Sequence, residues 1–194
     1  MFEYSAILIG YLLGSVSSAV VVTRALHLQD PRNVGSGNPG ATNVLRYGGK
    51  GAALATLLGD LLKGVIAVLI ARQLSAQSWV IAATMVTVFL GHLYPVFFGF
   101  KGGKGVATAL GAYVGASPLV GGALAGTWLV VAVLSRYSSL SALVATALSP
   151  LYVWYWLRDP AYVAGSVVMA AILFWRHRGN IKRLLAGTET KIGK

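Results

Sequence analysis

Sulfur chemistry and charge are what this 194-residue sequence has least of. It contains no cysteine, which excludes a disulfide, a thiolate metal site and a cysteine nucleophile. Only 11% of its residues are charged, less than half the share of about 25% that is typical of a soluble domain. Apolar residues make up 56% and the mean hydropathy is +0.71. The composition therefore indicates an integral membrane protein.

Acidic residues are especially few: five Asp and Glu stand against 16 Lys and Arg, for a net charge of +11. The three histidines, His27, His92 and His177, are scattered, so we expect no metal site and no cofactor. In a soluble protein this charge would indicate nucleic acid, which we do not expect here. In a membrane protein it fits the positive-inside bias and contact with anionic lipid. An anionic substrate is a second explanation, compatible with the first.

The sequence predicts a bundle of membrane-spanning helices in a single domain, residues 1–194. Backbone groups inside lipid must pair with one another, and the uncharged runs are too long for the strands of a barrel. The first run, residues 4–23, is about 30 Å long as a helix. Gly10, Gly14 and Ser18 recur in it every four residues, which predicts close packing against another helix. Further spans are predicted over 51–71, 79–100, 139–157 and 160–176.

Residues 105–135 carry no charge and would be about 46 Å long as one helix. Because a proline disfavours helix in the residue before it, Ser117-Pro118 is predicted to divide this run into a short and a longer helix. The basic segment 24–50 and the basic tail 176–194 lie on the same side only if the number of spans is odd. The sequence therefore predicts seven spans, with the N-terminus outside and the C-terminus cytoplasmic.

A glycine-rich strip, residues 35–46, separates the first two spans. Its three glycines allow close approach of a ligand to the backbone, and consecutive N–H groups before a helix form a nest for anions. Arg46 adds a planar group suited to phosphate. The other interpretation is a simple linker between helices. Hydroxyl and amide groups also crowd the strip, from Ser36, Asn38, Thr42 and Asn43.

A second glycine-basic cluster, Lys101-Gly102-Gly103-Lys104-Gly105, opens the helix predicted from residue 105. It is not a nucleotide P-loop, because Phe98 stands where the first glycine belongs and Gly105 replaces the Ser or Thr. Two ammonium groups at a helix N-terminus nevertheless suit an anion. Lysines that snorkel beside a flexible turn are the alternative.

The third cluster, Arg176-His177-Arg178-Gly179-Asn180, ends the last span. His177 could act as a general base or donate to an anion, and Asn180 lies three residues further on. Such a stretch is also typical of a basic end that stops transfer through the membrane. The charged pair Asp60 and Lys63, three residues apart within a span, is predicted to be structural.

Two further polar features accompany these clusters. His92 is interpreted as a hydrogen-bonded packing residue rather than as a catalyst. In the stretch Arg136-Tyr137-Ser138-Ser139-Leu140-Ser141, the hydroxyl groups are predicted to contribute to the pocket, with Ser141 as the candidate.

Together the motifs resemble a known family, the bacterial membrane glycerol-3-phosphate acyltransferases that use acyl-phosphate (the PlsY type). The resemblance lies in GSGNPGATNVLR at 35–46, GHLYPVFFGFKGGKGVAT at 91–108 and HRGNIKRLLAGTE at 177–189. It implies transfer of an acyl group from acyl-phosphate to the 1-hydroxyl of glycerol 3-phosphate. The products would be 1-acylglycerol 3-phosphate (lysophosphatidic acid) and phosphate, at the first step of phospholipid synthesis. The implied location is the bacterial cytoplasmic (inner) membrane, with the site facing the cytoplasm.

The resemblance also implies roles for individual residues. It makes Ser36 and Arg46 essential, links the second cluster to glycerol 3-phosphate, and makes Glu189 structural. The predicted catalytic residues are Ser36, Arg46, Lys104, His177 and Asn180. The residues predicted to bind substrate are Gly35, Ser36, Gly37, Asn38, Thr42, Asn43, Arg46, Lys101, Gly102, Gly103, Lys104, Gly105, Ser141, His177 and Asn180.

The chemistry expected is direct attack of the glycerol hydroxyl on the acyl carbonyl. Arg46 and Lys104 would stabilise the leaving phosphate, while Ser36 and Asn180 orient substrate or oxyanion. Three acceptors for the proton remain open: His177, a phosphate oxygen of the substrate, and a route through acyl-Ser36. The expected partners are acyl-phosphate, glycerol 3-phosphate and membrane lipid, with no obligate protein partner. A transporter or channel for organic anions, or a protein that holds anionic lipid with its basic tail, are competing functions.

Overall fold

Helices form all the regular structure of residues 2–193, the part of the chain that the computed structural model describes. The membrane bundle expected from the sequence is therefore all-α. Two of the elements are short 3₁₀ turns, η1 and η2. In chain order the elements are η1 (Phe2–Tyr4), α1 (Ser5–Gly14), α2 (Ser18–Ala25), α3 (Ala41–Leu74), α4 (Ser78–Leu93), η2 (Val96–Phe98), α5 (Val106–Ala116), α6 (Pro118–Ser135), α7 (Ser138–Leu157), α8 (Pro160–Arg176) and α9 (Arg178–Leu185).

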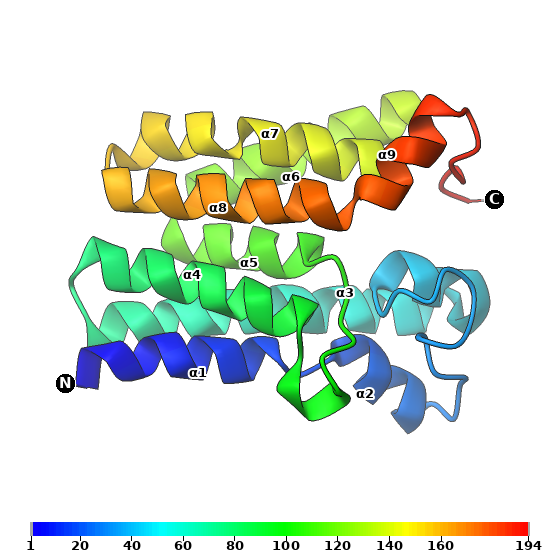
Figure 1. Ribbon diagram of the computed structural model, residues 1–194, viewed down its shortest axis with the longest axis horizontal. Helices are drawn as coiled ribbons and strands as arrows, with labels where there is room; N and C mark the ends of the chain where they lie inside the picture. Colours follow the sequence, from blue (N-terminus) through cyan, green and yellow to red (C-terminus); the bar gives the residue numbers. More distant parts are fainter. Residues whose placement is uncertain (1, 194) are drawn as a thin grey trace.

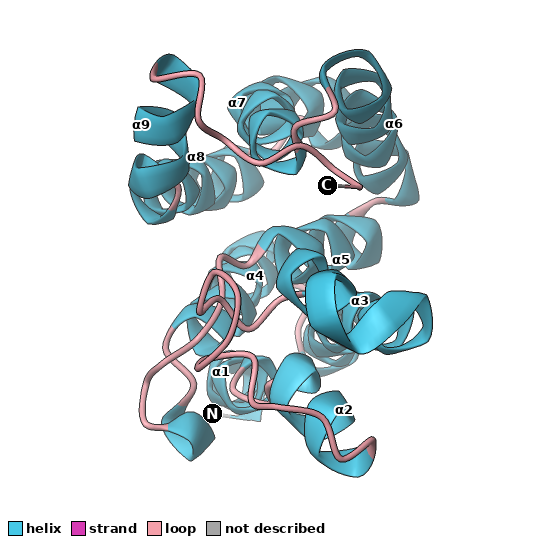
Figure 2. Ribbon diagram, turned by 90° about the vertical axis from the view of Figure 1, so that its right-hand side faces the viewer, coloured by secondary structure: helices cyan, strands magenta, loops and turns pink. Residues whose placement is uncertain are grey.

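The long helices lie side by side with their axes roughly parallel (Figure 1). Seen along these axes, α1 to α5 form one group and α6 to α9 form a second group (Figure 2). α2, the loop that follows it, α9 and the C-terminal tail all lie at one end of the bundle, opposite the end where α1 begins (Figure 1). The polar clusters 35–46, 101–105 and 176–180 thus gather toward the same end.

Four helices are long and apolar enough to cross a membrane: α3, α4 with its extension to Phe98, α6 and α7. The pair α1 and α2 passes the same test as one broken span, bent by 42°. α5 and α8 are shorter apolar helices. By length and composition, four or five segments are therefore candidate membrane spans, and the count of seven stays a prediction.

The first span differs from the single helix predicted over 4–23, because the helix breaks between Gly14 and Ser18. The Ser15 hydroxyl donates to the Tyr11 carbonyl at 2.9 Å, a local bond that competes with helix continuation. The break frees the Val16 carbonyl, which accepts a hydrogen bond from Lys63 Nζ at 2.8 Å. A side chain from α3 thus satisfies a backbone group that the broken helix cannot.

The predicted packing face of the first span is confirmed at its contact with α4. A Cβ atom on Gly14 would lie 2.1 Å from the Val88 carbonyl oxygen, and one on Gly91 would lie 2.2 Å from the Tyr11 oxygen. Glycine on both helices therefore allows the two backbones to touch.

Two other boundaries test the predictions. The break at Ser117-Pro118 is confirmed: α5 ends at Ala116, and the Ser117 hydroxyl caps α6 by accepting from the Val120 N–H at 3.4 Å. The glycine-rich strip, however, is a loop only up to Gly40, since residues 41–46 form the first turns of α3. α3 then kinks at Gly49, whose φ of 78° is the left-handed conformation that glycine allows.

The α-helix of the third span ends well before residue 100, the predicted end of the span 79–100. Its helix stops at Leu93, and Pro95 lacks the N–H that would continue it. The chain continues through η2 into the second glycine cluster.

Candidate functional site

A cavity of about 990 Å³ lies between the two groups of helices. Its lining comes from α3 to α9, from the loops before α3 and α5, and from the segment after α9. Its lining combines polar and cationic residues with many apolar ones. The polar lining includes Ser36, Asn38, Thr42, Arg46, Lys104, Arg176, His177 and Asn180, and the apolar lining includes Leu57, Leu58, Leu61, Leu110, Leu124 and Trp128.

The first cluster is shaped by the buried side chain of Asn43. Its Oδ1 accepts from the Ser36 N–H at 2.8 Å, and its Nδ2 donates to the carbonyls of Pro31 and Val34 at 2.9 and 3.0 Å. A Cβ on Gly35 would lie 2.3 Å from this Oδ1, so the turn requires glycine. The amide group of Asn43 therefore forms hydrogen bonds to the backbone of its own loop.

Other members of the strip face the cavity. Gly35, Ser36, Asn38, Thr42, Asn43 and Arg46 all line it, with Ser36, Thr42 and Arg46 exposed. Gly37 does not line it, so its predicted contact with substrate stays a prediction.

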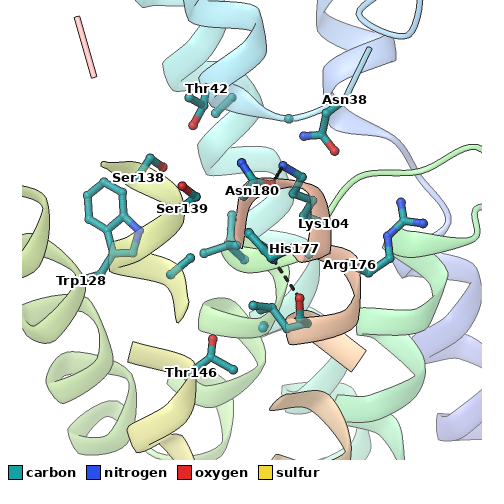
Figure 3. Close-up of a pocket in the computed structure, with 18 of the residues that line it drawn as sticks. Asn38, Thr42, Lys104, Trp128, Ser138, Ser139, Thr146, Arg176, His177 and Asn180 are labelled. Atoms are coloured by element: carbon teal, nitrogen blue, oxygen red, sulfur yellow. Dashed lines mark hydrogen bonds between the residues drawn. The ribbon is translucent and has the colours of Figure 1, made fainter. Parts of the chain in front are cut away.

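Lys104 and Asn180 meet across 76 residues of sequence (Figure 3). The Lys104 ammonium donates to Asn180 Oδ1, and Asn180 Nδ2 donates to Glu189 Oε1 at 2.5 Å. The other Glu189 oxygen accepts from Arg183 Nε at 2.7 Å. Burial lowers the pKa of Lys104 to about 8, and the positive charges of Arg183, Arg176 and Arg46 act in the same direction, against Glu189. Lys104 is thus a charged donor held at a fixed position.

His177 lies beside this chain of hydrogen bonds. Its Nδ1 is 2.9 Å from the Leu173 carbonyl oxygen, and because a carbonyl only accepts, Nδ1 carries the proton (Figure 3). Burial lowers the pKa of His177 to about 4, helped by the charge of Lys104. The imidazole is therefore neutral near pH 7, with the lone pair on Nε2.

The second cluster is held in place by a residue that the sequence did not single out for this task. Arg176 donates to the carbonyls of Gly102 and Gly103 at 3.1 and 2.8 Å. The Gly103 N–H in turn donates to the His92 carbonyl at 3.1 Å. Lys104 and Gly105 line the cavity, whereas Lys101, Gly102 and Gly103 do not. Substrate contacts for these three stay predictions.

The predicted ion pair of Asp60 and Lys63 is present, with Lys63 Nζ 2.9 Å from Asp60 Oδ1. His92 joins it: its Nδ1 is 3.0 Å from Lys63 Nζ and 3.5 Å from Asp60 Oδ1. All three side chains are buried. His92 thus packs through hydrogen bonds, as interpreted from the sequence, but as part of a charged cluster.

The serines at the start of α7 differ in whether they line the cavity. Ser138 and Ser139 line the cavity, and the Ser139 hydroxyl donates to Glu189 Oε1 at 2.6 Å. Ser141 is buried outside that lining, and its hydroxyl donates to the Tyr137 carbonyl at 2.8 Å. A role of Ser141 in substrate binding stays a prediction.

Among residues 2–193, no three His, Asp or Glu side chains lie close enough to hold a metal ion. The site can bind anions at its cationic end, present a neutral imidazole there, and accommodate an alkyl chain against its apolar walls.

Comparisons with known proteins match one family over nearly the whole chain. The family model described as glycerol-3-phosphate acyltransferase matches residues 4–187. A glycerol-3-phosphate acyltransferase from Thioalkalivibrio sulfidiphilus is 58% identical over 194 residues, covering 100% of this chain and 96% of the relative. One from Methylococcus capsulatus is 56% identical, covering 98% of this chain and 96% of the relative.

Two solved structures share the fold. The glycerol 3-phosphate form of PlsY (YgiH), an integral membrane glycerol 3-phosphate acyltransferase, is 42% identical with a TM-score of 0.93, covering 98% of this chain and 96% of the other. The lysophosphatidic acid form is 41% identical with a TM-score of 0.91, covering 98% and 95%. By sequence and by structure, this chain belongs to the glycerol-3-phosphate acyltransferase family.

Proposed function

We propose that the protein transfers a fatty acyl group from acyl-phosphate to the 1-hydroxyl of glycerol 3-phosphate. The products are 1-acylglycerol 3-phosphate (lysophosphatidic acid) and phosphate, the first step of phospholipid synthesis. We place it in a bacterial cytoplasmic (inner) membrane with seven spans, the site facing the cytoplasm, and no obligate protein partner. α2, which carries Arg24, and the basic segment 176–193 lie toward one end of the bundle (Figure 1), and this grouping supports the orientation.

The observation that carries the proposal is the position of Lys104 and His177 in a cavity with both cationic and apolar walls. An acyl-phosphate has the same division, with a charged phosphate at one end and an alkyl chain at the other. Cationic groups from three segments, Arg46, Lys104 and Arg176, line the polar part. The similarity to PlsY structures named for glycerol 3-phosphate and lysophosphatidic acid supports the acceptor and the product.

The reaction then needs one bond exchange. The 1-hydroxyl oxygen of glycerol 3-phosphate forms a bond to the acyl carbon, and the bond from that carbon to the phosphate oxygen breaks. Arg46 and Lys104 stabilise the departing phosphate, whose bond electrons stay on its oxygen. Ser36 and Asn180 orient the substrate or the carbonyl oxygen. Because acyl-phosphate is an activated mixed anhydride, no nucleotide enters the reaction.

Two groups can take the hydroxyl proton: Nε2 of His177 and a phosphate oxygen of glycerol 3-phosphate. His177 is suited to the task because it is neutral and its Nδ1 is fixed on Leu173. The same bond argues against acyl-Ser36, since Nδ1 is oriented by a carbonyl and not by the carboxylate of a triad. If His177→Gln keeps near-normal turnover across pH, the phosphate oxygen is the acceptor.

The test is purified protein with glycerol 3-phosphate and one donor at a time: acyl-phosphate, acyl-CoA or acyl carrier protein. We expect phosphate and lysophosphatidic acid to appear only with acyl-phosphate. Activity only with the thioesters would refute the donor assignment. Lys50→Gln serves as a matched control for the cationic variants, because Lys50 is exposed and lies outside the cavity lining. Trapping of labelled acyl-Ser36 without glycerol 3-phosphate would overturn direct transfer.

A further inference from the structure

The turn formed by residues 95–101, which includes η2, stands apart from the helix bundle. Figure 1 shows it in green below the end of α1 and beside α2, and Figure 2 shows it projecting sideways from the bundle. Two backbone bonds close the turn, from the N–H groups of Phe98 and Phe100 to the Pro95 carbonyl, at 3.1 and 2.9 Å. The turn therefore has a defined backbone shape.

Two phenylalanine rings on this turn are exposed. Phe97 is 60% exposed and Phe100 is 59% exposed. Phe100 also has a φ of 60°, directly after Gly99 at 64°. A bulky residue in this left-handed region costs free energy, and packing inside the protein does not repay it because the ring is exposed. A strained backbone that holds a ring outward indicates a partner outside the chain.

Two cations, Arg24 and Lys101, lie on or beside the turn. The Arg24 guanidinium lies over the Phe98 ring, 6.0 Å from its centroid, and Lys101 is exposed at the end of the turn. Arg32 donates to the Phe98 carbonyl at 3.3 Å and also pairs with Asp30, the nearby acid. Arg24 and Lys101 therefore give the surface of the turn a positive charge, which attracts an anionic partner.

The turn begins two residues after α4 ends, close to where the apolar part of a span gives way to water. Exposed aromatic rings next to Lys and Arg are typical of this interfacial depth. We propose that residues 95–101 lie in the headgroup region of an anionic phospholipid bilayer. Phe97 and Phe100 insert at the boundary with the acyl chains, and Arg24 and Lys101 contact lipid phosphates. This surface is separate from the cavity and does not depend on the reaction.

The absence of cysteine makes the insertion measurable. A single Phe97→Cys variant carries an environment-sensitive fluorophore in vesicles of phosphatidylcholine and phosphatidylglycerol, some of them brominated near the headgroup. The control is Asn33→Cys, an exposed polar position in the loop at the same end. We expect quenching by bromine to be at least about twofold stronger at position 97 than at position 33. Equal quenching at the two positions would overturn the proposal.

The charge contribution needs a second measurement. Quenching at position 97 is measured in vesicles with brominated phosphatidylglycerol and again in vesicles with brominated phosphatidylcholine. The ratio of the first value to the second reports the enrichment of anionic lipid near the turn. Arg24→Gln should lower that enrichment by up to about fivefold, the effect of one cation near a charged surface. A ratio that Arg24→Gln leaves unchanged would contradict the assigned contact. Disulfide-linked dimers of the unlabelled Phe97→Cys variant, in place of lipid quenching, would show that a second copy covers the turn and would also overturn the proposal.

Discussion

Two lysines, Lys63 and Lys104, lie in polar networks that differ in how many partners the lysine side chain has. The Lys63 ammonium forms an ion pair with Asp60 and hydrogen bonds with the Val16 carbonyl and with His92 Nδ1. Lys104 has one hydrogen-bond partner within residues 2–193, the neutral amide of Asn180. Two of its N–H groups are left for a ligand. We call the Lys63 network closed because its ammonium has three partners within the protein, although Asp60 and His92 also line the cavity. We call the Lys104 network open because its ammonium keeps N–H groups for the anion that we propose it binds.

The largest effect is expected when the closed network is broken. Lys63→Met leaves the Asp60 carboxylate buried without its cation, which should lower the free energy of unfolding by about 3–5 kcal/mol. Thermal unfolding of the detergent-solubilised protein measures this loss. The double variant Asp60→Asn, Lys63→Met should recover much of the stability, because it removes both charges. A single variant as stable as the parent would contradict the role assigned to Lys63.

Breaking the open network should cost activity instead of stability. Lys104→Gln removes one cationic donor at the site, and we expect kcat/KM to fall about 10²–10³-fold. Its unfolding temperature should stay close to that of the parent protein. If Lys104→Gln lowers activity only in proportion to the amount of folded protein, Lys104 has a structural role like that of Lys63, and the prediction is wrong.

A smaller effect is expected where the two networks meet. A Cβ on Gly103 would lie 2.2 Å from His92 Nε2 and 3.0 Å from the Pro39 oxygen, so Gly103→Ala must shift the loop that carries Lys104. A displacement of this kind should lower kcat up to about 100-fold. Gly122→Ala is the matched control, since no atom lies within 4 Å of its added Cβ. Similar kinetics for the two variants would show that the loop tolerates the shift.

The smallest effect concerns pH. The pKa of Lys104 is lowered to about 8, so its charge is present below this pH and is lost as the pH rises through it. We therefore expect kcat/KM to decline above about pH 8. Lys104→Arg should move that decline to higher pH, because arginine keeps its proton. A pH profile identical in the two proteins would assign the decline to another group.

Local patterns predicted much of the helical framework. The spacing of Gly10, Gly14 and Ser18 predicted close packing against another helix, which is α4 at the two glycines, and Ser117-Pro118 predicted the boundary of α6. The bend of the first span was missed because residues 4–23 form one uncharged run. What stabilises the bend is Lys63, 47 residues from Val16 in sequence.

The candidate site shows the same limit. The three polar clusters that the motifs singled out do meet at one cavity. The sequence did not show that Asn43 is occupied by its own loop, or that Arg176 clamps the second cluster. Both depend on which backbone carbonyls lie within reach, and a one-dimensional pattern does not contain that information. One signal could have suggested this contact: Arg176 ends a span, and the glycine-rich loop 101–105 offers backbone carbonyls outside the helices.

The bond from Lys63 to Val16 has a consequence for how the chain is made. While α1 and α2 are inserted first, the Val16 carbonyl has no partner, and an unpaired carbonyl in lipid costs several kcal/mol. Lys63 and Asp60 are costly charges in lipid if α3 enters the bilayer alone, because Lys63 then lacks the Val16 carbonyl as a partner. We therefore expect α1, α2 and α3 to leave the insertion machinery together. Neither the α1–α2 pair nor α3 alone satisfies its own polar groups in lipid.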